Sequence, residues 1–184
     1  MMVTTLSDLS SEMHIRKAQA SDAAALAQLA EQTFIATYGP HCDPNMVHEH
    51  CQKNFGVSQQ LAEIQNEHGI TLLQFVGDEL IGFVQMKQTE APPCVLVATD
   101  VSAICLHRYY VTQKWHGKGV ALILLEHAIE QAKAVGAQAM WLGMWQHNQR
   151  ALSFYQKHGF EIVGEVEYQF GKVIENDKVL FRVL

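Results

Sequence analysis

A short glycine-containing stretch, His116-Gly117-Lys118-Gly119-Val120-Ala121, lies where one periodicity of apolar residues gives way to another. The run before it, residues 104–111, is apolar and aromatic, which is typical of a buried strand. From Val120 to Val135 apolar residues recur every three or four positions, which predicts a helix, and Gly136 follows as a helix-ending residue. The chain is therefore expected to fold here as strand, glycine loop and helix.

This order of elements predicts a binding site for an anion. Glycines let a ligand approach the backbone closely, and the first amides of a helix point at the ligand with the helix dipole behind them. A phosphate or pyrophosphate is the expected ligand. An ordinary strand-to-helix turn has the same composition, so the rest of the chain must distinguish the two.

The glycine spacing discriminates between phosphate-binding loops. A P-loop needs four residues between its glycines and then Lys-Ser/Thr, whereas only Lys118 separates Gly117 from Gly119. A dinucleotide-binding loop needs Gly or Ala where this chain has Leu122, and an acidic residue where it has Trp145-Gln146. The P-loop is excluded and the dinucleotide loop is disfavoured.

A second informative stretch runs from Asn148 to Phe160. Asn148 is expected to cap a helix of about three turns that ends at Gly159. Asn148 and Tyr155 are seven positions apart, so their side chains lie within about 20° of each other on one helix face. Capping by Asn148 and packing by Tyr155 remain the ordinary explanation of either residue taken alone.

Both stretches resemble signatures of the GNAT N-acetyltransferase superfamily. The first is similar to the acyl-CoA pyrophosphate loop, Gln/Arg-x-x-Gly-x-Gly/Ala, with Gly119 and Ala121 at the small-residue positions and His116 replacing the usual Gln or Arg. The second is similar to Asn-x-x-Ala-x-x-Phe-Tyr-x-Lys-x-Gly-Phe, beginning at Asn148. The resemblance covers about residues 13–184.

The resemblance implies an α/β fold, the GNAT acyl-CoA N-acyltransferase fold, in which helices flank a central twisted mixed β-sheet. We expect a flexible tail over residues 1–12 and a single GNAT domain over residues 13–184. The elements predicted within it are a strand at 15–18, a helix capped by Ser21, two helical pieces in 41–68 with Pro44 at one start, a hairpin at 70–87, a loop at 88–102 with room for a strand at 95–97, parallel strands 104–111 and 139–145 joined by helix 120–135, and closing strands near 160–170 and 178–183.

The same resemblance implies roles for site residues. The loop would hold the pyrophosphate of acetyl-CoA through His116, Gly117, Lys118, Gly119, Val120 and Ala121. Backbone groups near Tyr109 and Val111 would contact the pantetheine arm and the thioester oxygen, and Asn148 would bind the cofactor or an ordered water. Tyr155, also at the cofactor, would be the general acid, because a phenol with a reference pKa of about 10 stays protonated until a thiolate leaves.

The base is expected on the strand 104–111. Related small-amine enzymes often carry Glu at the position that is His107 here. An imidazole can accept the ammonium proton directly or through water, which makes His107 a candidate catalytic base. The alternative is a buried core histidine, with a water chain or an acidic residue of the segment 34–55 as the base.

Composition excludes several function classes. A chain of 184 residues with 48% hydrophobic residues can bury one substantial core, and its net charge of -6 argues against nucleic-acid binding while suiting a cationic small molecule. No apolar run is long enough to span a membrane.

The first 11 residues lack the features of a secretory signal and the four cysteines form no Cys-x-x-Cys pair, so we expect a cytoplasmic protein with free thiols. The His and Cys residues of 41–51 match no zinc spacing, and no metal is expected.

The sequence thus predicts an acetyl-CoA-dependent N-acetyltransferase that acetylates a primary amine of a small molecule, such as a polyamine or an amino acid, by direct attack. The ending from Gly164 to Asp177 loosely resembles the polyamine and small-amine branch. Two alternatives stay open: a catalytically idle acyl-CoA-binding sensor of the same fold, and a protein or peptide N-acetyltransferase. A homodimer is compatible with each of them.

Overall fold

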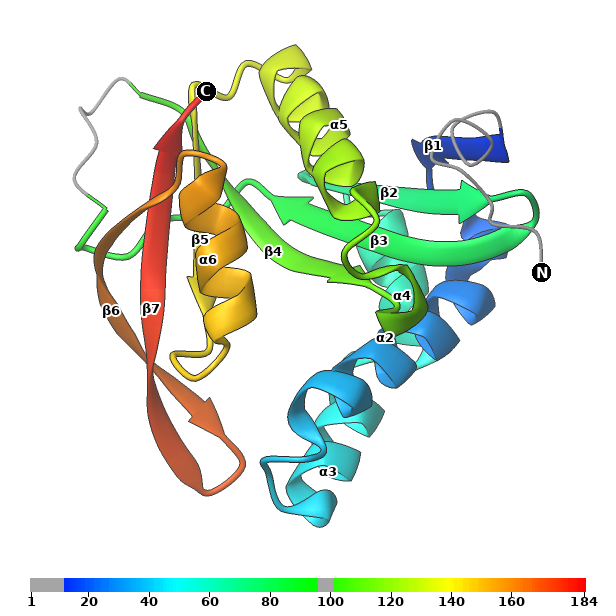
Figure 1. The fold of residues 1–184 in the computed structure, drawn as a ribbon, viewed down its shortest axis with the longest axis horizontal. Coiled ribbons are helices and arrows are strands. Elements are labelled where there is room, and N and C mark those ends of the chain that lie inside the picture. The colour runs from blue at the N-terminus through cyan, green and yellow to red at the C-terminus, as the bar shows by residue number, and fades with distance from the viewer. Residues whose placement is uncertain (1–11, 96–100) are drawn as a thin grey trace. The chain divides into compact units, whose positions relative to one another are not determined.

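The computed structural model describes residues 12–95 and 101–184. Within them, the strands form a seven-stranded mixed sheet in the order β1-β2-β3-β4-β5-β7-β6 (Figure 1). The strands are β1 (Met13–Lys17), β2 (Gly69–Val76), β3 (Glu79–Lys87), β4 (Ala103–Val111), β5 (Ala139–Met144), β6 (Glu161–Phe170) and β7 (Val173–Val183). The helices are α2 (Ala23–Tyr38), α3 (Pro44–Asn54), α4 (Val57–Ile64), α5 (Val120–Ala134) and α6 (Gln149–Lys157), with the short 3-10 helices η1 (Ala20–Asp22) and η2 (Gln113–Trp115).

The chain divides into two compact units. The first contains residues 1–85 and 108–128, and the second contains residues 86–107 and 129–184. Strands β3 and β4 and helix α5 contribute residues to both units. The expectation of one domain over residues 13–184 stays a prediction.

The first unit is built on the predicted hairpin. Gly77 adopts a φ of 56° in the turn between β2 and β3, a conformation that glycine tolerates. Strand β1 pairs antiparallel with β2 from Met13↔Val76 to Lys17↔Leu72. The apolar face predicted for α2 is confirmed, because Leu26, Leu29, Ala30 and Phe34 are all buried.

The prediction that Ser21 caps this helix is wrong. Ser21 lies inside η1, and α2 begins at Ala23. The carboxylate of Asp22 organises this start, since it accepts hydrogen bonds from the Arg16 guanidinium at 2.7 and 2.9 Å and from the Gln19 amide at 2.7 Å. By contrast, α3 begins at Pro44 as predicted, with Asp43 as its N-cap.

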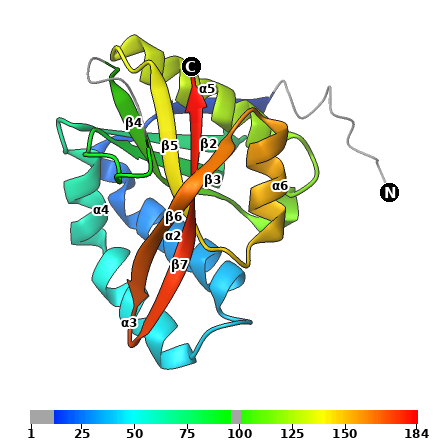
Figure 2. The same ribbon diagram turned by 90° about the vertical axis from the view of Figure 1, so that its left-hand side faces the viewer.

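The second unit confirms the predicted parallel pair. Strand β4 pairs parallel with β5 from Ala103↔Ala139 to Cys105↔Trp141, and β5 pairs antiparallel with β7. Helix α6 ends before Gly159, which has a φ of 82°. Figure 2 shows β6 and β7 as a long twisted hairpin beside β5.

Strand β7 begins earlier than the sequence predicted, at Val173 instead of near residue 178. Many side chains of β6 and of the first half of β7 are exposed, so the alternation of buried and exposed positions that marks a strand is weak there. The predicted tail over 1–12 and the strand at 95–97 fall almost wholly outside the described residues.

Gly164 tests the packing of this hairpin. A Cβ at position 164 would lie 2.5 Å from the Cβ and 2.9 Å from the Sγ of Cys94. Gly164→Ala should therefore lower the free energy of unfolding by about 1–3 kcal/mol in denaturant melts. Gly143→Ala is the matched control, because a Cβ at that position has no atom of residues 12–95 or 101–184 within 4 Å. Equal stability of the two variants would contradict the contact.

Candidate active site

The glycine loop joins the end of β4 to the start of α5, as the sequence predicted. Strand β4 ends at Val111, η2 makes one 3-10 turn, and α5 begins at Val120. Gly117 and Gly119 have φ values of 74° and 77°, and no atom of the described residues lies within 4 Å of a Cβ built on either. Glycine is therefore required here for backbone conformation, and the loop surface is open to a ligand.

Two lysines add positive charge beside the loop. The Lys118 Nζ lies 4.7 Å from the centroid of the Trp115 ring, and the Lys114 Nζ lies 5.5 Å from it. Lys114 is paired with the Glu79 carboxylate at 2.8 Å, whereas Lys118 belongs to the loop itself. This charge and the first amides of α5 together suit a phosphate group.

His116 is turned back toward the strand. Its Nε2 lies 2.7 Å from the Val111 carbonyl oxygen, and its backbone amide donates to the Gln113 carbonyl at 3.1 Å. A carbonyl can only accept a hydrogen bond, so the ring nitrogen is the donor. Two of the donors through which His116 was expected to contact a cofactor are therefore used within the protein.

Two side chains hold the first turn of α5. The Tyr109 hydroxyl donates to the Ala121 carbonyl, and the Gln74 Nε2 donates to the Val120 carbonyl at 2.9 Å. Tyr109 thus has a structural contact in addition to the backbone role expected for it. Gln74 is fully buried and was not predicted; its signal was a polar residue at an inward position of an apolar strand.

His107 is exposed, so the alternative of a buried core histidine is wrong. Alternation along β4 places His107, Tyr109 and Val111 on one face of the strand. Arg108, the next residue along the strand, lies on the opposite face. The position of His107 is compatible with a solvent-connected base.

Asn148 and Tyr155 come from α6. The Asn148 Oδ1 accepts the Ala151 amide at 3.1 Å, which confirms the predicted cap and leaves its amide nitrogen as the group suited to a ligand. Tyr155 is only 7% exposed, and its ring meets Phe154 and Phe160 edge-on at 5.4 Å each. Packing therefore fixes the position of the phenol.

A polar network that the sequence did not predict lies within the first unit. The Arg108 Nη1 donates to the Gln85 Oε1 at 2.8 Å, and the Gln85 Nε2 donates to the Gln60 Oε1 at 3.1 Å. Both glutamines are buried, and the guanidinium lies 5.0 Å from the centroid of the Phe55 ring. Burial and then the charge of Arg108 lower the pKa of His50 to about 4, so this imidazole is neutral at pH 7.

The sequence also did not predict a pair of carboxyl groups on β7, those of Glu175 and Asp177. Burial, and then the charge of Glu175, raise the pKa of Asp177 to about 6. The Asp177 Oδ1 is buried and finds no hydrogen-bond partner among the described residues. Glu175 accepts a hydrogen bond from the Gln146 Nε2 at 3.2 Å and lies 3.9 Å from the His147 Nε2. Carboxyl groups of this kind can attract a cationic amine.

The described residues contain no group of three or more His, Cys, Asp or Glu side chains that could hold a metal ion. The four cysteines are free, as expected. No helix in the described ranges is long and apolar enough to cross a membrane.

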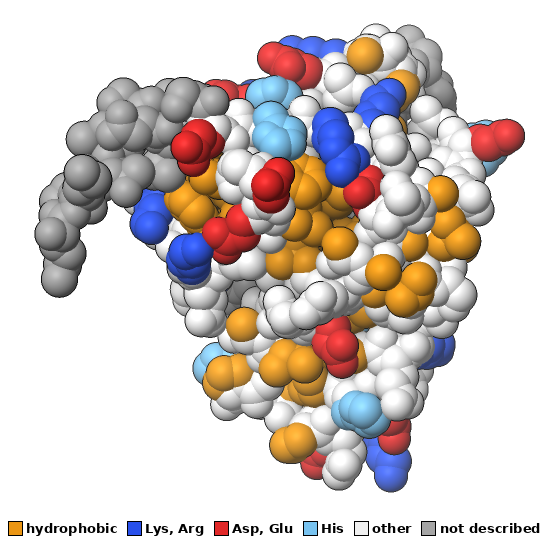
Figure 3. All heavy atoms as spheres, turned by 90° about the vertical axis from the view of Figure 1, so that its right-hand side faces the viewer, with side chains coloured by type: hydrophobic (Ala, Val, Ile, Leu, Met, Phe, Trp, Pro, Cys, Tyr) orange, Lys and Arg blue, Asp and Glu red, His pale blue; other side chains and the backbone are white. Residues whose placement is uncertain are grey.

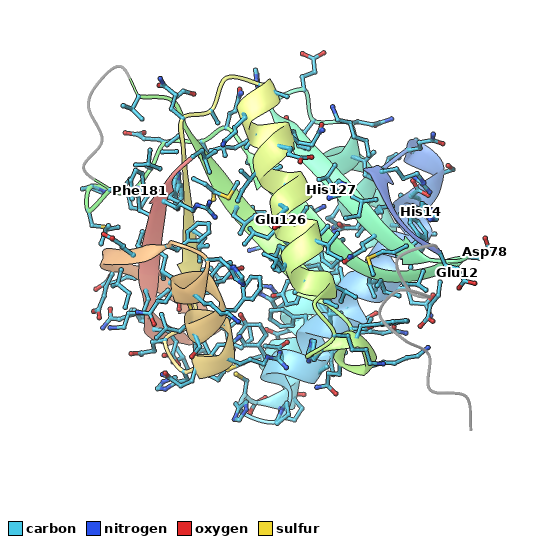
Figure 4. All side chains as sticks on the ribbon, turned by 45° about the horizontal axis from the view of Figure 1, so that its top comes forward. Glu12, His14, Asp78, Glu126, His127 and Phe181 are labelled. Atoms are coloured by element: carbon cyan, nitrogen blue, oxygen red, sulfur yellow. The ribbon has the colours of Figure 1, made fainter. Side chains whose placement is uncertain are left out.

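On the face drawn in Figure 3, acidic, basic and His side chains lie around apolar areas, and the basic side chains form no continuous surface among the described residues. In Figure 4, Glu126 and His127 project from α5, and Glu12 and Asp78 lie near each other at the sheet edge.

Comparison with known proteins identifies the family. The model of the acetyltransferase (GNAT) family matches residues 24–160. An uncharacterized N-acetyltransferase of Mycobacterium tuberculosis (strain ATCC 25618 / H37Rv) is 30% identical over 165 residues, which cover 89% of this chain and 99% of that protein. A spermine/spermidine N(1)-acetyltransferase of Bacillus subtilis (strain 168) is 26% identical over 72 residues, which cover 39% of this chain and 47% of that protein.

A solved structure agrees in fold. The PaiA N-acetyltransferase from Thermoplasma acidophilum, crystallised in complex with coenzyme A, superposes with a TM-score of 0.75 and 22% identity over 94% of this chain and 99% of that one. At this identity the likeness shows the fold alone. Because the family model spans most of the chain, this protein belongs to the GNAT family of N-acetyltransferases and is an acetyl-CoA-dependent acyltransferase.

Proposed function

We propose that the enzyme acetylates the primary amine of a small molecule, such as a polyamine or an amino acid, by direct attack of the amine on the thioester of acetyl-CoA. The observation that carries the donor half is the open glycine loop ahead of α5, with its two positive-φ glycines. The acceptor class is supported by the partial similarity to the spermine/spermidine enzyme and by the carboxyl groups of Glu175 and Asp177.

The resemblance to GNAT enzymes suggests the donor contacts, and the open glycine loop supports the first of them. Backbone amides from Gly117 to Ala121 bind the pyrophosphate, and Lys118 adds a positive charge beside it. Backbone groups near Tyr109 and Val111 bind the pantetheine arm and the thioester oxygen. The amide nitrogen of Asn148 donates to the cofactor or to an ordered water.

In the proposed reaction the neutral amine attacks the thioester carbon, and the carbon–oxygen double bond opens to an oxyanion. His107 takes the proton that the nitrogen loses, directly or through water. When the oxyanion collapses, the carbon–sulfur bond breaks, and Tyr155 donates its proton to the leaving thiolate. The products are an N-acetylated amine and coenzyme A.

A panel assay tests the acceptor class. Free thiol released from acetyl-CoA is measured with polyamines, amino acids, aminoglycosides and peptides, each against a reaction without acceptor. Turnover that is fastest with small amines supports the proposal. Faster turnover with peptides favours a peptide N-acetyltransferase, and coenzyme A binding without turnover on any acceptor favours a sensor.

Gly119→Asp tests the pyrophosphate site. The substitution places a negative charge where a phosphate must approach, so the Kd for acetyl-CoA in calorimetry should rise about 100-fold or more. Gly136→Asp is the matched control, because Gly136 has a similar φ of 84° and lies after the C-terminal end of α5. Both variants carry the backbone strain, and only the loop variant should lose affinity. A folded Gly119→Asp protein with wild-type affinity would refute this placement.

Tyr155→Phe tests the general acid. The variant keeps the ring that packs on Phe154 and Phe160 but lacks the proton, so kcat should fall about 10²- to 10⁴-fold with little change in the Kd for acetyl-CoA. Tyr168→Phe on β6 removes a hydroxyl from an exposed ring and serves as the control. Wild-type kcat in Tyr155→Phe would leave Tyr155 with a packing role only.

His107→Ala tests the base through the pH profile. An imidazole changes charge between about pH 5 and 8, and only its neutral form accepts a proton, so kcat/KM of the wild type should fall toward low pH. The variant should have a lower rate and a flattened acid limb. His127→Ala, on the exposed side of α5, controls for the loss of a surface histidine. An unchanged profile in folded His107→Ala would move the role to a water chain or an acidic residue.

A further inference from the structure

We propose that His116 is a positioning residue, whose Nε2 hydrogen bond to the Val111 carbonyl holds the end of β4 and the glycine loop in the conformation that receives the pyrophosphate. The inference rests on the proposed binding of acetyl-CoA at this loop. It concerns contacts within the first unit only, where Figure 1 shows the loop between β4 and α5.

The segment from Val111 to His116 is closed by hydrogen bonds. The Thr112 amide donates to the Ile81 carbonyl at 2.8 Å, which anchors the segment to β3. The Trp115 amide donates to Thr112 at 2.9 Å, which closes the 3-10 turn. The His116 ring then reaches back over this turn to the Val111 carbonyl at 2.7 Å. The last residue of the strand and the first residue of the loop are thereby tied directly.

The residues beyond His116 need such a tie. Glycine has more backbone freedom than any other residue type, and a Cβ on Gly117 or Gly119 would meet no atom within 4 Å in the part of the chain that the structure describes. On the helix side, Gln74 and Tyr109 hold the carbonyls of Val120 and Ala121. With His116 held on the strand side, only three loop residues stand between two fixed ends.

A preformed loop binds its ligand more tightly, because the entropy of ordering it is not lost on binding. The His116 hydrogen bond adds a side-chain contact to the backbone turn and to the contact of Lys118 with the Trp115 ring on the strand side of the loop. The expected signature is a weaker complex with acetyl-CoA and an unchanged chemical step.

The hydrogen bond also selects one form of the imidazole. The Val111 oxygen needs a donor, so Nε2 must carry a hydrogen. The neutral Nε2–H tautomer and the doubly protonated ring both satisfy this requirement, whereas the neutral Nδ1–H tautomer does not. Nitrogen NMR of the His116 ring at neutral pH, without any cofactor, should therefore show a protonated Nε2. An unprotonated Nε2 would overturn the proposal.

Amide side chains provide matched substitutions. Gln places its amide nitrogen about where the imidazole has Nε2, Asn places it about where the imidazole has Nδ1, and Ala removes both. His116→Ala and His116→Asn should raise the Kd for coenzyme A in calorimetry about 3- to 10-fold, the size expected for one net hydrogen bond. His116→Gln should restore the affinity to within about twofold of the wild type.

Kinetics and exchange separate positioning from general loss of structure. In His116→Ala, KM for acetyl-CoA should rise while kcat at saturation and KM for the amine change less than about twofold. Hydrogen exchange of the amides from Gly117 to Val120 should speed up, with the amides of β2 unaffected. A His116→Ala protein with wild-type affinity, or a His116→Gln protein as weak as His116→Ala, would overturn the hydrogen-bond role.

These measurements test the positioning role of His116 separately from the binding of acetyl-CoA. If wild-type protein fails to bind coenzyme A, the proposed function fails, and the ring tautomer and the exchange rates of the loop still decide whether His116 holds the loop. If His116→Ala does not fold, His116→Asn and the wild-type tautomer measurement decide the question.

Discussion

The structure depends most on a backbone constraint, the positive φ of Gly117 and Gly119 between a strand that ends and a helix that begins. Two such residues in close succession turn the chain sharply and leave the loop ahead of the first amides of α5 without side chains at these two positions. This geometry is useful only if both ends of the turn are fixed. Hydrogen bonds from side chains of neighbouring elements provide that fixation.

Those hydrogen bonds show how the protein uses buried polar groups. Gln74 is fully buried in β2 and holds a carbonyl of the first turn of α5, where a helix end needs accurate placement. Gln85 and Gln60 are equally buried and lead to the guanidinium of Arg108. Burying an amide costs free energy unless it is bonded, so the bonded amide groups of these residues favour one arrangement of their elements.

In the second unit, packing fixes the position of the Tyr155 phenol. The Asn148 cap starts α6, and Tyr155 follows two turns later with its ring against Phe160. A hydroxyl carried by a buried ring has few alternative positions, which favours a group that must meet a leaving atom. The packing of the Tyr155 ring therefore suits its proposed role as the general acid.

Local pattern by itself determined much of this protein. The change of apolar period around residues 116–121, the cap at Asn148 and the stop at Gly159 depend on steric and hydrogen-bonding preferences of neighbouring residues, which act within a few positions of the chain. The parallel pair of β4 and β5 was predictable for another reason, because an apolar strand, a helix and another apolar strand connect in only one common way. Family resemblance and fold were therefore readable from the sequence.

Tertiary structure alone decided which partners the polar side chains find. Gln74 and Val120 are 46 positions apart, and Arg108 and Gln85 are 23 apart, so no local pattern records these bonds. Ser21 looked like a cap by composition, but Asp22 took the role of organising the turn because β1 brings Arg16 within 2.7 Å of its carboxylate. The burial of Asp177 has the same origin, since it depends on which segments the folded sheet brings together.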